Sequence, residues 1–292
     1  MPVSAPSRPV ARGVELRHVE LPRTTLRVGI AGDGPPLIML PATISLIEDW
    51  EALIRFVGQS YSAHFFELPG HGGSSPLDSP YRSELIAESV VDLADKLGFD
   101  TFSLFGFSFG GLLALRTLQH AGDRIERVAL FSPYIGREAL LHSRAKLLAL
   151  RVLLTALKPE IARRGVLGGL SGRRGSELLA WFMHEIGKFE TSADLTARLR
   201  SFTASSVDVL IAQVNEVLTT PAASLAGPFA SRCLFGMSMR DPMLDYSTTR
   251  AFLTGTFPDI SEERWDTPYH AAPRALTFED YERDHRSVLT WR

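Results

Sequence analysis

The sequence predicts an α/β fold in which a mostly parallel central sheet carries helices on both faces. Unbroken apolar runs, typical of strands that are covered on both sides, alternate along the chain with segments of helical periodicity. In residues 84–97 the apolar side chains fall on roughly one helical face, and Gly98 follows as a helix stop. Regular alternation of strand and helix favours parallel strands that are joined by crossover helices.

The first half of the chain supplies most of these elements. Residues 14–30 alternate apolar and polar side chains around Pro22, which predicts two strands of an antiparallel hairpin. Further strands are predicted at 37–40, 61–70, 101–108 and 127–133, with helices at 84–97 and 110–122.

The alternation stops between Arg137 and Leu225, where the sequence shows only helical patterns and turns. It resumes with a strand at 231–238, a turn and helix at 241–257, a weak polar strand near 259–267 and a closing helix from Thr277 onward. A helical block inside an α/β pattern is typical of an insertion over one edge of the sheet. We therefore predict a first core part at 1–136, a helical cap or lid insertion at 137–225 and a second core part at 226–292.

The composition and charge of the chain argue against several classes of protein. A chain of 292 residues with 45% hydrophobic residues can bury a large core. Its net charge of -2 provides no general basic field for nucleic acid. The single cysteine, Cys233, excludes an internal disulfide framework and favours a reducing compartment. No signal-peptide pattern and no transmembrane segment are recognised, so we expect a cytoplasmic protein.

Two short stretches superficially suggest a metal or phosphate site. Residues 184–190 begin like a zinc-binding helix, but Lys188 stands where the second histidine is needed. Residues 165–175 are rich in glycine, but no strand precedes them and they lack the Lys-Ser/Thr ending of a phosphate-binding loop. We therefore expect neither a metal nor a cofactor.

A Gly-x-Ser-x-Gly pentapeptide, centred on Ser108, lies between a predicted buried strand and a predicted helix. Gly106 and Gly110 leave room for a sharp turn that a Cβ atom would block. Such a turn lifts the serine hydroxyl clear of the sheet at the carboxyl ends of the strands, where parallel sheets bind ligands. The helix that begins there supplies N–H groups and the positive end of its dipole to a developing oxyanion.

A serine nucleophile needs a base and an acid that orients the base. Asp241 directly follows the predicted strand 231–238, and His270 follows the last weak strand. The chain order Ser108, Asp241, His270 fits the Ser…Asp…His scheme. His285 competes with His270 for the role of base, but its surroundings indicate a residue on a helix face, so His270 is favoured.

At this point the sequence resembles the α/β-hydrolase superfamily, over nearly the whole chain from about residue 14. The resemblance implies an α/β-hydrolase fold with a serine nucleophile at Ser108, a base at His270 and an acid at Asp241. It also implies an oxyanion hole formed by the backbone N–H groups of Phe109 and Thr43. The matching segments are GDGPPLIML (32–40), ELPGHGGS (67–74), GFSFGG (106–111) and GMSMRDP (236–242).

Three places depart from the pattern of the family. The His-Gly that usually follows the third strand is replaced by Pro41-Ala42. Glu67 stands where the family has aspartate in the turn after the fourth strand, and Tyr269 replaces glycine before His270.

The first part of the predicted cap is strongly basic. Residues 137–175 contain nine lysines and arginines but only Glu138 and Glu160 as acids, and apolar residues recur at helical spacing between the cations. One interpretation is a lid whose apolar face covers the site and whose basic face is simply solvated. The other is an apolar pocket for an acyl chain with a basic rim for an anionic partner, such as an acyl-carrier protein, coenzyme A or an anionic membrane surface.

These features predict a serine esterase or thioesterase that acts on a small-molecule or carrier-linked acyl substrate. Two alternatives stay open at this point. The same triad serves C–C bond hydrolysis, lyase and cyclisation reactions, and the unusual Pro41-Ala42 segment also suits a ligand-binding protein without catalytic activity.

Overall fold

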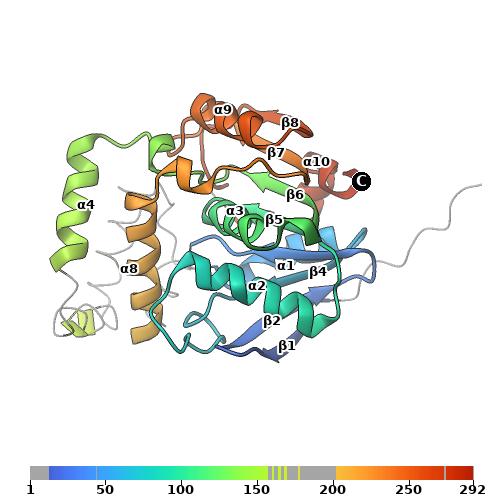
Figure 1. Ribbon diagram of the computed structural model, residues 1–292, viewed down its shortest axis with the longest axis horizontal. Helices are drawn as coiled ribbons and strands as arrows, with labels where there is room; N and C mark the ends of the chain where they lie inside the picture. The colour runs from blue at the N-terminus through green and yellow to red at the C-terminus, as the bar shows by residue number, and fades with distance from the viewer. Residues whose placement is uncertain are drawn as a thin grey trace, which may run out of the picture.

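The centre of the computed structural model is an eight-stranded sheet with the strand order β1-β2-β4-β3-β5-β6-β7-β8 (Figure 1). The structure describes residues 13–43, 45–156, 202–272 and 274–291, together with isolated residues between 160 and 177. The pairings β1–β2 and β2–β4 are antiparallel, and the others are parallel, so the predicted sheet type is confirmed. The strands are β1 Glu15–Glu20, β2 Thr25–Ala31, β3 Pro36–Leu40, β4 Ser62–Phe66, β5 Phe102–Phe107, β6 Ile125–Phe131, β7 Arg232–Ser238 and β8 Ile260–Trp265.

Helices cover both faces of this sheet, as predicted. Side chains of β3 alternate between the two faces: Ile38 and Leu40 join one buried cluster, whereas Leu37 and Met39 join the other. The first cluster is completed by α2 Ser83–Leu97, α3 Phe109–Ala121 and α9 Tyr246–Thr256, and the second by α1 Ile47–Val57, α10 Phe278–Asp284 and α11 Ser287–Thr290.

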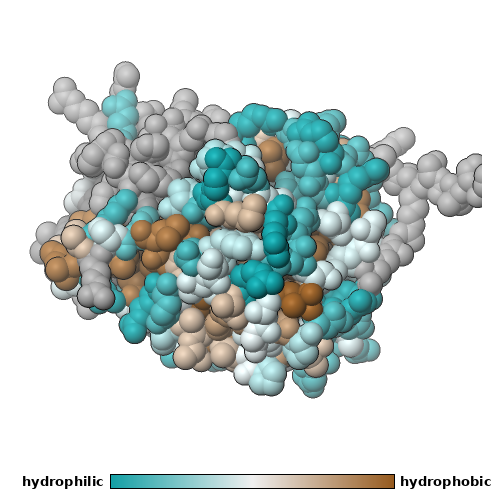
Figure 2. Space-filling model, turned by 90° about the horizontal axis from the view of Figure 1, so that it is seen from above, coloured by the Kyte–Doolittle hydropathy of each residue, from teal (hydrophilic) through white to brown (hydrophobic). Residues whose placement is uncertain are grey.

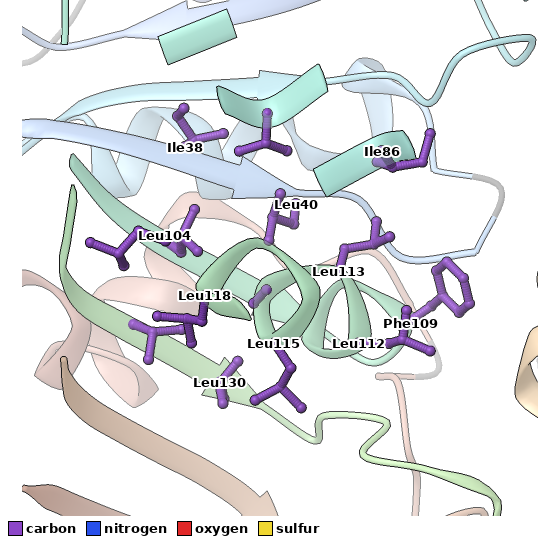
Figure 3. Packing of buried hydrophobic residues seen from close by; sticks show 14 of the residues in the cluster. Ile38, Leu40, Ile86, Leu104, Phe109, Leu112, Leu113, Leu115, Leu118 and Leu130 are labelled. Carbon is purple, nitrogen blue, oxygen red and sulfur yellow. The ribbon is translucent and has the colours of Figure 1, made fainter. Parts of the chain in front are cut away.

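Helix α3 lies at the middle of the first cluster. Figure 3 shows its leucine side chains meeting those of the neighbouring strands and of α2, among them Leu104, Leu113 and Ile86. All three are fully buried. Because α3 begins directly after Ser108, this packing fixes the helix end on which the predicted nucleophile lies.

The ends of two helices test the predicted boundaries. Gly98 ends α2 with a positive φ of 74°, a conformation that glycine adopts without steric cost. The predicted closing helix, in contrast, is divided into α10 and α11. His285 has φ -132° at the end of α10, and its ring packs against Trp265 and Phe131 rather than continuing a helix face. Tertiary contacts therefore interrupt a segment that contains no glycine or proline.

Two helices between β6 and β7 lie at the end of the sheet toward which β6 points (Figure 1). They are α4 Arg144–Ala156 and α8 Ala204–Thr219, and they share a small apolar cluster formed mainly by Leu150, Leu154 and Leu218. Much of 157–201 lies outside the described residues, including all of 184–190 and most of 165–175, the two stretches considered as metal or phosphate sites. The cap boundaries 137 and 225 therefore stay a prediction.

The outer side of α4 is apolar. Leu148 and Val152 are 63% and 62% exposed, and Figure 2 shows hydrophobic residues at the left, where Figure 1 places α4. No helix among the described residues is long and apolar enough to cross a bilayer.

Candidate active site

Ser108 occupies the sharp turn between β5 and α3. Its φ of 53° and ψ of -117° lie outside the regions that L residues normally adopt. The flanking glycines make the turn sterically possible: a Cβ on Gly106 would lie 2.5 Å from the carbonyl oxygen of Gly110, and one on Gly110 would lie 2.5 Å from that of Leu40. The pentapeptide thus forms the strained strand-to-helix turn that its sequence predicts.

Hydrogen bonds to the end of β6 hold this turn in place. The Ser108 N–H donates to the carbonyl oxygen of Phe131 at 3.1 Å, and the Ser108 carbonyl oxygen accepts from the N–H groups of Tyr134 and Gly111, each at 2.9 Å. Ser132, which lies between Phe131 at the end of β6 and Tyr134, also has a positive φ of 40°. The backbone of the serine is therefore fully paired despite its unusual conformation.

The structure brings the three predicted triad residues together. The Nε2 atom of His270 lies 2.8 Å from Ser108 Oγ, and its Nδ1 atom lies 2.7 Å from Asp241 Oδ2. Asp241 follows β7 and His270 follows β8, so the carboxyl ends of three different strands supply the three groups. The side chains of Asp241 and His270 are 0% and 4% exposed.

Backbone donors fix the orientation of Asp241. Its Oδ1 atom accepts hydrogen bonds from the N–H groups of Met243 at 2.8 Å and Leu244 at 3.0 Å, which leaves Oδ2 for the imidazole. A carboxylate accepts only, so it selects the tautomer of His270 with its hydrogen on Nδ1. The lone pair of Nε2 then faces the Ser108 hydroxyl, which is the arrangement that a general base requires.

An aromatic residue that sequence reasoning did not single out lies against this histidine. The rings of Phe107 and His270 have centroids 5.4 Å apart at an angle of 31°, and Trp50 lies 5.9 Å from Phe107 on another side. The only sequence signal for this contact is the position of Phe107 beside Ser108, because its partner comes from the far end of the chain.

The competing histidine lies elsewhere. The ring of His285 packs among Phe131, Trp265 and Tyr281. Burial lowers the pKa of this imidazole below its usual value. His270, and not His285, is therefore the histidine that is hydrogen-bonded to Ser108 and Asp241.

The predicted oxyanion donors lie on two neighbouring elements. Phe109 is the first residue of α3, where backbone N–H groups have no partner within the helix. Thr43 is half-buried in the connection between β3 and α1, and β3 pairs directly with β5. A nucleophile, a base with its orienting acid and a helix N-terminus together can perform acyl transfer.

Comparison with known proteins agrees with this architecture. A family described as "alpha/beta hydrolase fold" matches residues 35–171. The solved structure of N-formylmaleamic acid deformylase from Pseudomonas putida S16 aligns with a TM-score of 0.67 at 13% identity, covering 92% of this chain and 99% of that one. This chain belongs to the α/β-hydrolase superfamily. The mostly parallel sheet of this α/β hydrolase is thus the fold that the family description and the structural alignment indicate.

Curated relatives of this α/β hydrolase match a smaller part of the chain. Pimeloyl-[acyl-carrier protein] methyl ester esterase of Nitrosomonas europaea is 29% identical over 108 residues, which are 36% of this chain and 40% of that protein. N-formylmaleamate deformylase of Pseudomonas putida is 29% identical over 118 residues, which are 39% and 43% of the two chains. The alignments therefore span less than half the length of either relative.

Proposed function

We propose that this α/β hydrolase is a serine hydrolase that cleaves acyl esters or thioesters. The observation that carries the proposal is the continuous chain of hydrogen bonds from Ser108 through His270 to Asp241, with heavy-atom distances of 2.8 and 2.7 Å. The relatives support the hydrolytic class, since they include a methyl ester esterase and a deformylase.

In the proposed first half-reaction, Ser108 Oγ attacks the carbonyl carbon of the substrate while Nε2 of His270 takes the hydroxyl proton. Asp241 stabilises the imidazolium that forms and keeps the ring in place. The negative charge on the carbonyl oxygen is stabilised by the N–H groups of Phe109 and Thr43. Collapse of the tetrahedral intermediate breaks the bond to the alcohol or thiol, which leaves with the proton from His270.

The second half-reaction releases the acyl group from Ser108. His270 takes a proton from water, and the resulting nucleophile attacks the acyl carbon. When the second tetrahedral intermediate collapses, the bond to Ser108 Oγ breaks and Oγ recovers its proton from His270. A carboxylic acid is released, and no cofactor enters either step.

For the substrate we propose an acyl group on an anionic carrier, such as acyl-carrier protein or coenzyme A. The charge of residues 137–175 supports this choice, since nine basic residues oppose two acidic ones in a chain of net charge -2. A local excess of positive charge attracts an anionic partner and orients it before contact. The Nitrosomonas relative is itself named for an ester carried on acyl-carrier protein.

A fluorophosphonate probe tests the proposal directly, because it forms a covalent bond with an activated serine. We expect rapid labelling of the wild-type protein and none of Ser108→Ala, with the modified peptide containing residue 108. Ser89→Ala, which removes a different buried serine hydroxyl in α2, is the control and should label like the wild type. Equal labelling of Ser108→Ala would exclude the proposed nucleophile.

Turnover of 4-nitrophenyl esters of increasing acyl length then separates esterase activity from the alternatives. We expect hydrolysis with a preference for one range of chain lengths. A protein that is labelled by the probe but hydrolyses no ester of the series would favour C–C bond cleavage or a lyase reaction. A protein that neither labels nor hydrolyses would indicate a binding function.

A further inference from the structure

Glu67, in the turn after β4, holds a fully buried carboxylate. Its Oε1 atom accepts hydrogen bonds from Arg27 Nη1 at 2.9 Å and from the N–H of Ile47 at 3.1 Å. Its Oε2 atom accepts from the N–H of Gly73 at 2.6 Å. Burial of a charge is costly unless it is paired and hydrogen-bonded, and this carboxylate has partners on three separate segments.

The glycine-rich turn is shaped around this side chain. A Cβ on Gly72 would lie 2.3 Å from Glu67 Oε2, and one on Gly73 would lie 2.5 Å from Arg27 Cδ. Ser74 completes the turn by donating to the carbonyl oxygen of Glu67 at 2.7 Å and accepting from the N–H of Arg27 at 2.9 Å. The residues of the turn 67–74 therefore hold the Glu67 carboxylate in one position.

The most distant partner of Glu67 is the N-terminus of α1. Ile47 is the first residue of this helix, and Leu46 at the N-cap position offers no side-chain hydrogen bond. Glu67 thus accepts one of the first N–H groups of the helix, which have no partner within the helix, and adds negative charge at the positive end of the helix dipole. Arg27 strengthens the attachment, since its Nη2 atom also pairs with Glu48 in the first turn of α1 at 2.6 Å.

This attachment fixes one end of the connection that carries Thr43. Residues 41–46 join β3 to α1. At the other end of the connection, the carbonyl oxygen of Leu40 lies so close to Gly110 that a Cβ there would approach it to 2.5 Å. Along the chain, Thr43 therefore lies between an end packed against the serine turn and an end held by Glu67.

We propose that Glu67 is a positioning residue for the reaction, which holds the start of α1 so that the Thr43 N–H faces the oxyanion. The proposal rests on the serine-hydrolase function proposed above. Glu67 touches neither substrate nor Ser108, so its effect passes entirely through backbone geometry. Loss of one oxyanion donor lowers kcat by about 10²–10³-fold, and a displacement of about 1 Å can cost about 10²-fold.

The variant Glu67→Gln tests this role with little change in volume. The amide replaces one acceptor oxygen by a donor, so it cannot accept from Arg27, Ile47 and Gly73 together. Ser74→Ala is the matched control, because it removes two hydrogen bonds of the same turn and none to α1.

For Glu67→Gln we expect kcat on a 4-nitrophenyl ester to fall about 10- to 100-fold with KM within about two-fold of wild type. A boronic acid that forms a tetrahedral adduct with Ser108 should bind more weakly by the same factor. Ser74→Ala should keep the wild-type kcat even where its melting temperature falls. If Glu67→Gln does not fold, Glu67→Asp, which retracts the charge by one methylene, should show the same pattern with a smaller loss.

Amide hydrogen exchange supplies a readout that does not depend on catalysis. Residues 45–49 should exchange faster in Glu67→Gln than in wild type and should be unchanged in Ser74→Ala. Unchanged exchange, a wild-type kcat in Glu67→Gln, or equal losses of kcat in both variants would each overturn the positioning role. Failure of the wild type to react with fluorophosphonate would instead reject the serine-hydrolase proposal, while the exchange comparison would still decide whether Glu67 holds α1.

Discussion

Ser108 combines a strained backbone with complete hydrogen bonding. A non-glycine residue in such a sparsely populated region costs on the order of 1–3 kcal/mol and persists only where its surroundings determine it. Here the surroundings are the Phe131 carbonyl oxygen and the Tyr134 N–H on one side and two glycines without Cβ atoms on the other. The strain is thus supported by β6 and α3 rather than by the turn alone.

The two candidate bases give a prediction at the level of single residues. Only His270 is hydrogen-bonded to Ser108, so His270→Gln should lower kcat/KM by at least about 10⁴-fold without preventing folding. His285→Gln removes a ring from an aromatic cluster and should lower the free energy of unfolding by about 0.5–3 kcal/mol while kcat/KM stays within about three-fold. Ester turnover and thermal unfolding of both variants check this, and an equally large loss in His285→Gln would contradict it.

Sequence reasoning singled out three residues that the structure brings together, but it assigned no role to the residues that contact them. Ser108, Asp241 and His270 were predictable because each follows a strand whose carboxyl end meets the others at one edge. Phe107 and Glu67 were not assigned such roles, because their partners, His270 and the N–H of Ile47, come close only through the fold. Hydropathy patterns carry no information about such contacts.

Among the elements, α8 joins the inserted helices to the core. Its Val209 belongs to the main buried cluster, and its Val217 carbonyl oxygen accepts from the Tyr134 hydroxyl at 2.7 Å. Its Glu216 Oε1 atom accepts from the N–H of Ser83, at the start of α2, at 2.7 Å. Apolar packing at Val209 and two hydrogen bonds near the C-terminus of α8 therefore attach this helix to the core.

The contact of Glu216 predicts a pH dependence of stability. Burial raises the pKa of Glu216 above its ordinary value. A carboxyl group with a raised folded-state pKa contributes stability below its unfolded pKa of about 4.3, and this stability is lost as the pH rises through the folded value. Glu216→Gln cannot ionise and keeps an acceptor for the Ser83 N–H, so it should melt at a higher temperature than wild type at pH 7–8.

The difference between Glu216→Gln and wild type should shrink as the pH falls toward 4, because Glu216 then becomes increasingly protonated in the folded and the unfolded chain alike. Calorimetry between pH 4 and pH 8 measures it. A difference in melting temperature that stays constant over this range would show that ionisation of Glu216 does not control the contact with α2.

Strands and helices were predicted correctly where the local hydropathy pattern of a segment agrees with the contacts that the segment makes in the fold. The alternation of apolar and polar residues in 14–30 correctly predicted the hairpin β1–β2, and the unbroken apolar runs correctly predicted the parallel strands. The closing helix was wrong as one continuous element because aromatic packing around His285 outweighs the helical preference of the segment. The polar strand β8 was recognisable mainly by its place in the alternation, since its side chains are only partly buried.

The molecule as a whole depends on two apolar clusters separated by the sheet. Leu113→Ala, in α3, should therefore lower the free energy of unfolding by about 2–5 kcal/mol, since the buried side chain leaves a cavity. Leu148→Ala, on the exposed side of α4, should change it by no more than about 0.5 kcal/mol. Urea unfolding curves measure both, and a comparable loss for Leu148→Ala would show that this side chain is covered in solution.

The chain leaves the sheet after β6 and re-enters it at β7, and these two strands are direct neighbours. Ser108 precedes this excursion, whereas Asp241 and His270 follow it. The two ends of the segment between β6 and β7 are thus adjacent in the sheet, whatever the length of that segment. A laboratory chimera that keeps the chain through Tyr134 can therefore exchange the rest of this segment while Ser108, Asp241 and His270 stay on the retained strands.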